Sequence, residues 1–408
     1  MNDLDARLRD ALDAAARTIP DHATGPGLTT TEVRRGPRPR TWAIAALAAA
    51  AVVAAVAVPL AIYSKDAPPP VASGDCPKPP AVENPLQYPK DTRPNKEWPW
   101  VNGVPFGPGP RVPFTVTGEG GGNYLQDGDL RVPLPAGKDF GVWGRVHCGW
   151  MGALGVRHGE IEGVGVLSTS GEFRSFGMPS GDGMTLSPTG ERTAIVRPTQ
   201  DGKAQLVVIE TATGREVASI PTDPDTEVVG WNSNGIFYME AREESRTQLW
   251  TIDAAPVAVE TGGFRLTVWR TTDRMVLQSN NQVPKPGQQP CLKVVEFHQG
   301  RLNTVMQRCS KNGTEGTLSP DGKVLVTSMG PEGLLGYSVP ANTPTKASTA
   351  AMISAHHETI WEDNRHIVTS GGLGTTASVT LRCDVIDGDC EKISYGSQKA
   401  PSIGLGSR

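Results

Sequence analysis

Tight turns recur along most of this chain at a nearly constant spacing. Each turn joins two short strands of alternating polarity, and successive turn centres are 42 to 47 residues apart. Seven of them follow one another, near Gly128, Ser170, Thr213, Ala255, Gln299, Ala341 and Gly388. A period of about 40 to 50 residues built from short strands is typical of a β-propeller, whose blades cannot bury their faces alone. The sequence therefore predicts an all-β, seven-bladed β-propeller.

A second turn, expected between the first two strands of each blade, repeats with the same period. Its two clean copies, residues 186–190 and 318–322, read Leu-Ser-Pro-Thr-Gly and Leu-Ser-Pro-Asp-Gly. Pro sets φ at the second turn position and Gly accepts the exit geometry at the fourth, so both predict type I turns. Fainter copies begin at five tryptophans: Trp100, Trp150, Trp231, Trp269 and Trp361. We expect the last four to fill space between sheets, with a sugar-binding aromatic platform as the alternative.

These turns resemble the WD40-like propeller repeats of the TolB type, whose blades carry a Ser-Pro-Asp-Gly turn before a hydrophobic strand. The resemblance covers residues 100–396 and is specific in two blades, at Ser187 and Ser319. It implies the propeller fold and a tendency to bind other proteins or extended ligands. It implies no catalytic residues.

An apolar run of 23 residues, 41–63, precedes the repeats. At 1.5 Å per residue, a helix of this length crosses a hydrocarbon core about 30 Å thick. Four arginines between positions 34 and 40 flank its N-terminal side, and only Lys65 and Asp66 follow it. The positive-inside rule then predicts a single-pass cell-membrane protein with a cytoplasmic N-terminus and an extracytoplasmic propeller. A cleaved signal peptide is the alternative, although a 40-residue leader is long for one.

These features predict five segments. Residues 1–40 form a short cytosolic segment with an amphipathic helix, 41–63 a transmembrane helix, 64–99 a Pro-rich extracytoplasmic linker, 100–396 the propeller and 397–408 a C-terminal tail. A helix of about 16 residues is marginal alone, so its apolar face implies a cytosolic helical partner or the membrane interface. This layout resembles actinobacterial single-pass proteins often associated with extracytoplasmic-function sigma factors.

All six cysteines follow the apolar run: Cys76, Cys148, Cys291, Cys309, Cys383 and Cys390. An even count confined to the exported part predicts three disulfides in an oxidising compartment. Cys383 and Cys390 flank the last turn, and Cys291 and Cys309 fall on the outer two strands of the fifth blade, which leaves Cys76 with Cys148. A zinc site is the alternative, but no pair has the Cys-x2-4-Cys spacing.

Recognisable catalytic motifs are missing from the sequence. It contains no G-x-S-x-G, H-E-x-x-H or Walker A pattern. The densest group of ionisable residues is His356, His357 and Glu358, followed by Glu362, Asp363 and His366, for which we predict a solvated loop. The net charge of −4, without a basic patch rich in aromatics, argues against nucleic acid as a partner. We predict no cofactor, no metal and no enzymatic activity.

Longer polar loops at 197–203, 240–247 and 280–290 are expected to project from one face of the propeller, where binding surfaces gather. Arg242 and Arg246 are the candidate binding residues there, and a protein or cell-wall component is the expected ligand. The favoured hypothesis is a membrane-anchored binding module, a sensor or scaffold in cell-envelope signalling. Two alternatives stay open: a propeller-fold glycan hydrolase or lyase, and an anti-sigma-like regulator acting through the cytosolic segment.

Overall fold

The structure, a computed structural model, describes twelve stretches of the chain. They are residues 76–96, 99–118, 122–156, 161–177, 184–240, 246–279, 289–309, 316–328, 334–345, 359–373, 377–397 and 402–405. All of them belong to the second of two compact units, Lys65–Arg408. No helix within these stretches is long and apolar enough to cross a membrane. The predicted cytosolic helix and the apolar run 41–63 lie outside the described residues.

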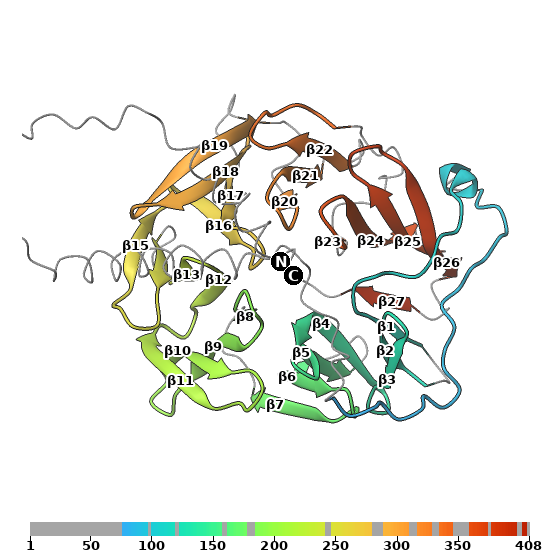
Figure 1. Cartoon of the computed structure of the whole chain (residues 1–408), viewed down its shortest axis with the longest axis horizontal. Coiled ribbons are helices and arrows are strands. Elements are labelled where there is room, and N and C mark those ends of the chain that lie inside the picture. Colours follow the sequence, from blue (N-terminus) through green and yellow to red (C-terminus); the bar gives the residue numbers. More distant parts are fainter. Residues whose placement is uncertain are drawn as a thin grey trace, which may run out of the picture. The chain divides into compact units, whose positions relative to one another are not determined.

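The described strands form seven antiparallel sheets around a central axis, which confirms the seven-bladed propeller (Figure 1). Blade one contains β27 (Ser402–Leu405), β1 (Phe114–Thr117), β2 (Tyr124–Asp127) and β3 (Leu130–Pro133). Blade two contains β4 (Lys138–Val146), β5 (Gly149–Val156), β6 (Ile161–Ser168) and β7 (Phe173–Gly177). Blade three contains β8 (Met184–Leu186), β9 (Arg192–Pro198), β10 (Ala204–Glu210) and β11 (Glu216–Thr222).

The other four blades follow in chain order. Blade four contains β12 (Glu227–Asn232), β13 (Gly235–Met239), β14 (Arg246–Trp250) and β15 (Val257–Glu260). Blade five contains β16 (Phe264–Val268), β17 (Arg274–Ser279), β18 (Cys291–His298) and β19 (Arg301–Cys309). Blade six contains β20 (Gly316–Leu318), β21 (Val324–Ser328) and β22 (Leu334–Ser338). Blade seven contains β23 (Thr359–Trp361), β24 (His366–Leu373), β25 (Ala377–Asp384) and β26 (Cys390–Ser397).

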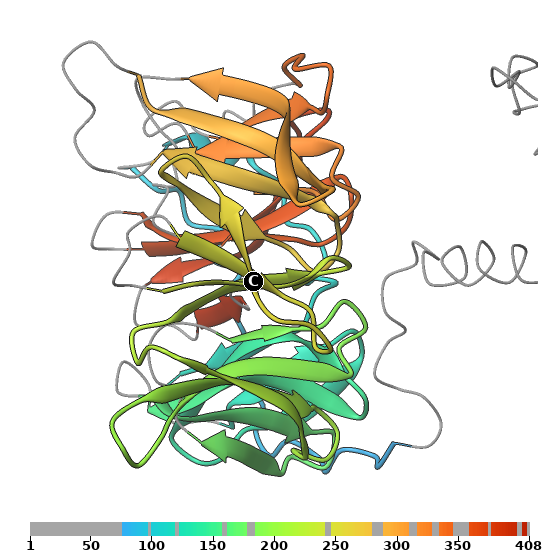
Figure 2. The ribbon, with the colours of Figure 1, turned by 90° about the vertical axis from the view of Figure 1, so that its left-hand side faces the viewer.

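The seven predicted turns are all found at one place in the blade, after its third strand. Gly128 and Gly388 lie in two of these turns with φ of 60° and 80°, a conformation that glycine adopts without steric cost. In blade six the turn near Ala341 leads only to a single bridge between Tyr337 and Pro344. Because neighbouring strands alternate in direction, this turn and the one after the first strand lie on the same face of the ring, which we name the turn face (Figure 2).

The ring is closed by the C-terminal strand. Residues 397–408 are predicted to form a tail, but Ser402–Leu405 within them pair antiparallel with β1 and form the inner strand of blade one. No tight turn therefore joins the inner strand of this blade to its neighbour β1, because the two are far apart in the sequence. Trp100, predicted to begin such a turn, lies instead in the 3-10 helix η1 (Pro99–Gly103), and Trp150 lies within β5 rather than in a turn.

The segment before β1 packs on the propeller. The sequence predicts a linker at 64–99, but the described residues from Cys76 to Arg111, which we name the strap, lie against blades seven, one and two. Isolated parallel bridges join Lys90 to Tyr395 and Phe106 to Lys392, so the strap covers the outer edge of β26. The Lys392 ammonium is buried and donates a hydrogen bond of 3.0 Å to the carbonyl of Val101. An exposed strand edge invites pairing with other chains, and the strap removes that edge.

The recurring tryptophans pack inside the domain, as predicted for a structural role. Trp150 is fully buried, and its indole N–H donates to Asp127 Oδ2 at 2.9 Å. Trp231 packs between blades three and four, and Trp269 packs against the cluster shared by blades five and six. The indole N–H of Trp361 donates to Thr317 Oγ1 of blade six at 3.1 Å. Each ring therefore fills the space between neighbouring sheets.

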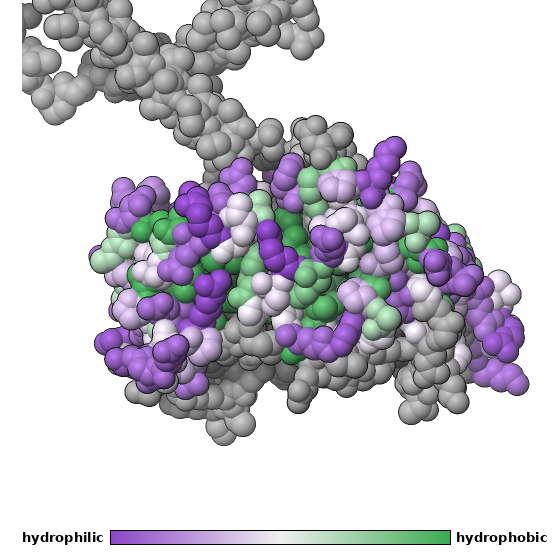
Figure 3. Space-filling view, turned by 90° about the horizontal axis from the view of Figure 1, so that it is seen from below, coloured by the Kyte–Doolittle hydropathy of each residue, from purple (hydrophilic) through white to green (hydrophobic). Residues whose placement is uncertain are grey.

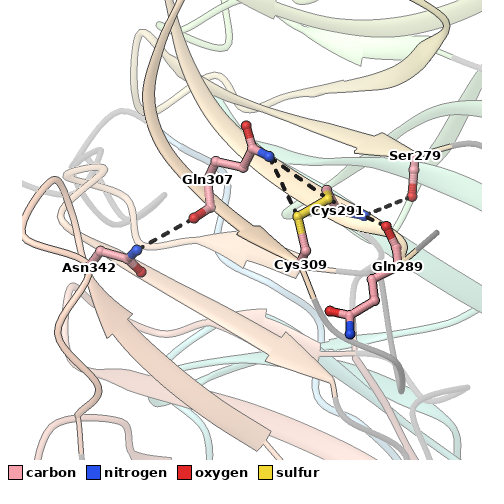
Figure 4. Close-up of a disulfide and its surroundings, with 6 residues drawn as sticks. All are labelled: Ser279, Gln289, Cys291, Gln307, Cys309 and Asn342. Atoms are coloured by element: carbon pink, nitrogen blue, oxygen red, sulfur yellow. Dashed lines mark hydrogen bonds between the residues drawn. A yellow bond between two sulfur atoms is a disulfide. The ribbon is translucent and has the colours of Figure 1, made fainter. Parts of the chain in front are cut away.

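The structure contains the three expected disulfides, Cys76–Cys148, Cys291–Cys309 and Cys383–Cys390. Cys291 and Cys309 lie directly opposite each other on β18 and β19 (Figure 4). The side-chain amide of Gln307 donates to Cys309 Sγ at 3.5 Å, and the carbonyl of Gln307 accepts from Asn342 of blade six at 3.4 Å. This bond therefore sits beside the junction of blades five and six.

Removing the Cys76–Cys148 disulfide is expected to cost about 2 kcal/mol more than removing Cys383–Cys390. The reason is that the entropy lost by the unfolded chain grows with the logarithm of the closed loop, and the two loops span 72 and 7 residues. Urea unfolding of the two double Cys→Ser variants measures the difference. Equal losses of unfolding free energy would contradict this entropic account.

Candidate functional site

The predicted loop residues fall only partly within the described structure. The strands that flank 197–203, 240–247 and 280–290 are the second and third strands of their blades, and the strand ends next to these segments lie at the face opposite the turn face. Arg246 begins β14, is exposed and lies opposite Glu260 of β15. Arg242 lies outside the described residues, as do His356, His357 and Glu358.

The other members of the predicted ionisable group lie at the turn between β23 and β24, where their side chains make structural contacts. They are Glu362, Asp363 and His366. The side chain of Glu362 is fully buried and accepts hydrogen bonds from Arg382 Nε at 2.6 Å and Nη2 at 2.7 Å. Burial opposes the charge of Arg382, but the hydrogen bonds to Glu362 and Glu391 outweigh it and raise the Arg382 pKa. Glu362 is thus committed to a buried ion pair.

Asp363 is held in the same way. Its Oδ1 accepts from the backbone N–H groups of Arg365 and His366, both at 2.7 Å, and its Oδ2 lies 2.9 Å from His366 Nδ1. Partial burial opposes the charged carboxylate, but these hydrogen bonds outweigh it and lower the Asp363 pKa. A carboxylate with its oxygens engaged by its own turn is a structural one.

The five-residue turn motif begins at the end of the inner strand. In several blades its second position holds a buried polar side chain. In blade three Ser187 Oγ accepts from the N–H of Arg192 at 3.1 Å, and in blade six Ser319 Oγ accepts from the N–H of Val324 at 2.9 Å. In blade four Asn232 Oδ1 accepts from Asn234 N–H at 2.9 Å. All three residues are buried. This position therefore supplies an acceptor that satisfies the backbone of the turn.

In blade five the same position is occupied by Arg270, which has no acceptor to offer. Its side chain instead reaches Gly144 of β4, because a Cβ built on Gly144 would lie 2.7 Å from both Nη1 and Nη2 of Arg270. Gly144 belongs to blade two, and blades two and five are not neighbours in the ring (Figure 1). The Arg270 side chain therefore crosses the ring interior near the turn face, and only glycine at position 144 leaves room for it.

Arg270 carries a charge that no described residue balances. Within the described residues the Arg270 guanidinium has no hydrogen-bond or ion-pair partner. Burial, and then the positive charge of Arg145, lower the Arg270 pKa to about 10. Arg145 itself is paired, because its Nε donates to Asp127 Oδ2 at 2.7 Å. Arg270 is thus a partly buried cation beside Arg145, whose own charge is paired with the Asp127 carboxylate.

Sequence reasoning missed Arg270 as a candidate. The residue lies in the degenerate turn that begins at Trp269. The signal that could have identified it is an Arg, which only donates hydrogen bonds, at a position where other blades have a Ser or Asn acceptor. The contact between Arg270 and Gly144 could be seen only in the folded ring, because the two residues are 126 positions apart in the sequence.

The sulfurs of Cys76 and Cys148 and the imidazole of His147 also lie together, within 4.8 Å of one another. Metal binding by cysteine needs the thiolate. Both sulfurs are consumed by the disulfide, so these three residues offer no metal site while that bond is intact.

The surface of the described residues offers no broad apolar patch. Its exposed large apolar side chains are Ile161, Val217, Val257 and Ile386, which come from four different blades. The side of the ring seen in Figure 3 shows the same mixture, with small hydrophobic areas interrupted by hydrophilic residues. Polar and charged contacts are therefore the ones this surface can offer to a ligand.

No protein-family model and no curated protein matches the chain. Solved structures are similar at low identity. The computationally designed Ika8 protein is 10% identical, with a TM-score of 0.43 over 79% of this chain and 99% of its own. The β-propeller domain of the Trilobed protease from Pyrococcus furiosus is 13% identical, with a TM-score of 0.44 over 63% and 82%. Prolyl oligopeptidase B from Galerina marginata is 8% identical, with a TM-score of 0.47 over 71% of this chain and 52% of its own.

Proposed function

We propose that this protein is a membrane-anchored, extracytoplasmic β-propeller binding module that acts as a sensor or scaffold in cell-envelope signalling. The observation that carries the proposal is the pairing of all six cysteines into three disulfides. Disulfides of this kind form and persist in oxidising compartments. The apolar run 41–63, with arginines on its N-terminal side, supplies an anchor of the required length and direction.

A binding role fits the way the ionisable residues are used. Glu362 is engaged in the ion pair with Arg382 of β25, and Asp363 and His366 bond each other within their turn. The ring meanwhile presents polar and charged groups on a rigid frame, which suits a protein or a cell-wall component as ligand. A reporter enzyme that works only outside the cytoplasm tests the location.

The reporter is expected to be active when fused after Pro80 and inactive when fused after Thr30. The physical reason is the excess of arginine before residue 41, which keeps that end in the cytoplasm. Fusions to a cytoplasmic reporter at the same two positions are the control and should give the reverse pattern. Activity of the extracytoplasmic reporter at Thr30 alone would overturn the proposed orientation.

One experimental result would contradict the binding role. If the purified full-length protein hydrolyses a glycan or a peptide, and the combined variant His356→Ala, His357→Ala, Glu358→Gln loses that activity, the protein is an enzyme. The hydrolase alternative would then replace the binding module.

A further inference from the structure

We propose that the ring interior at Arg270 is a binding site for an anionic group, a carboxylate or a phosphate, carried by the ligand of this propeller. The proposal deepens the proposed function and depends on it only in taking the propeller to be a binding module. Its basis is the placement of Arg270 against Gly144, together with the unpaired state of its guanidinium among the described residues.

Arg270 differs from three other arginines of low exposure in the described residues. Arg382 is paired with Glu362 and Glu391, Arg145 with Asp127, and Arg274 with Glu296 at 2.8 Å. Removing a charge from water is costly unless it is paired. The chain supplies a carboxylate in each of those three places, whereas the residues that the structure describes offer none to Arg270. A ligand anion would complete the same pattern.

Residues from two blades form the site. Arg270 comes from the turn after β16 of blade five, and Gly144 comes from the inner strand β4 of blade two. The guanidinium therefore lies in the ring interior and not between two neighbouring sheets. Arg270 as a whole residue is only partly buried. The turn after β16 places Arg270 near the turn face.

The hydrogen-bond donors of Arg270 suit an anionic group. A guanidinium presents five N–H groups in a rigid planar fork that matches the oxygens of a carboxylate or a phosphate. The neighbouring guanidinium of Arg145 is paired with Asp127, so Arg270 is the group that would bind the anion. Glycine at 144 allows the fork to lie against the strand, where any larger side chain would collide with it.

The test is the thermal unfolding of the full-length protein in sodium chloride, sodium succinate and sodium phosphate at equal ionic strength. An anion that binds the folded state raises the unfolding midpoint as its concentration increases. We expect succinate or phosphate to raise the wild-type midpoint above its value in chloride. Which of the two does so identifies the carboxylate or the phosphate as the preferred group. Arg270→Met should weaken the apparent affinity by about 10- to 100-fold, the loss typical of a hydrogen bond to a charged group.

Two further variants control for charge and folding. Arg301→Met removes an exposed arginine at the start of β19 and should leave the anion response unchanged. Arg270→Lys keeps the positive charge without the fork and should bind the same anion more weakly than the wild type. In chloride, Arg270→Met should be at least as stable as the wild type, because it removes a partly buried charge that no described residue pairs.

Three results would overturn the site: no rise above chloride in the wild type, an equal rise in Arg270→Met, or a loss in Arg301→Met as large as in Arg270→Met. The outcome is independent of the reporter fusions. An anion response that depends on Arg270 in a protein whose propeller proves to be cytoplasmic would sink the proposed location and leave this site standing.

Discussion

Deleting the residues after Pro401 is expected to lower the free energy of unfolding by at least about 4 kcal/mol, or to prevent folding. The deletion removes β27, which pairs with β1 along four residues. Backbone hydrogen bonds contribute about 1 kcal/mol each, net of solvation. β27 also contacts β4 of blade two and β24 of blade seven, so its loss leaves three blades without a neighbour at the inner end.

The matched control is a chain that ends at Leu405, which keeps all of β27 and loses only the last three residues. Chemical unfolding followed by tryptophan fluorescence compares the two truncations with the full chain. The control should unfold like the full chain. Equal stability of the two truncated proteins would contradict the view that β27 closes the ring.

The second large effect is expected at the buried ion pair of blade seven. Replacing Arg382 by Met should lower the unfolding free energy by about 3 to 5 kcal/mol, the usual cost of leaving one buried charge without its partner. The side chain of Glu362 is fully buried, and that of Arg382 is 5% exposed. Removing Arg382 also removes its hydrogen bond to the carbonyl of Gly109 in the strap, at 2.8 Å.

Two comparisons isolate this effect. Arg215→Met breaks an exposed pair with Glu210, 3.5 Å apart, and should lower the unfolding free energy far less than Arg382→Met does, because solvent screens an exposed pair. The double variant Glu362→Leu with Arg382→Met removes both charges and should be more stable than Arg382→Met alone, because no charge is left buried without a partner. If the double variant is the less stable of the two, the cost lies in lost packing and not in the unpaired charge.

Local chemistry in the sequence was enough to predict the number of blades. The hairpin turns at Gly128 and Gly388 need a conformation that glycine supplies, and the polar cap at Ser187 and Ser319 satisfies its own turn. Such interactions join residues a few positions apart, so a single sequence contains them. The disulfides followed from the same repeat, because the position of Cys291, Cys309, Cys383 and Cys390 within a blade brings each pair together.

The tertiary structure alone decided the closing strand, the strap and the site at Arg270. The strand Ser402–Leu405 is too short to show a pattern, and it becomes a strand only because blade one lacks an inner one. The prolines of the strap predict an extended chain, but not that β26 has an open edge to receive it. The approach of Arg270 to Gly144 depends on how the blades close into a ring, which brings together positions distant in the sequence. Turns and blade count are local properties and could be read from the sequence, whereas contacts across the ring exist only once all seven blades are in place.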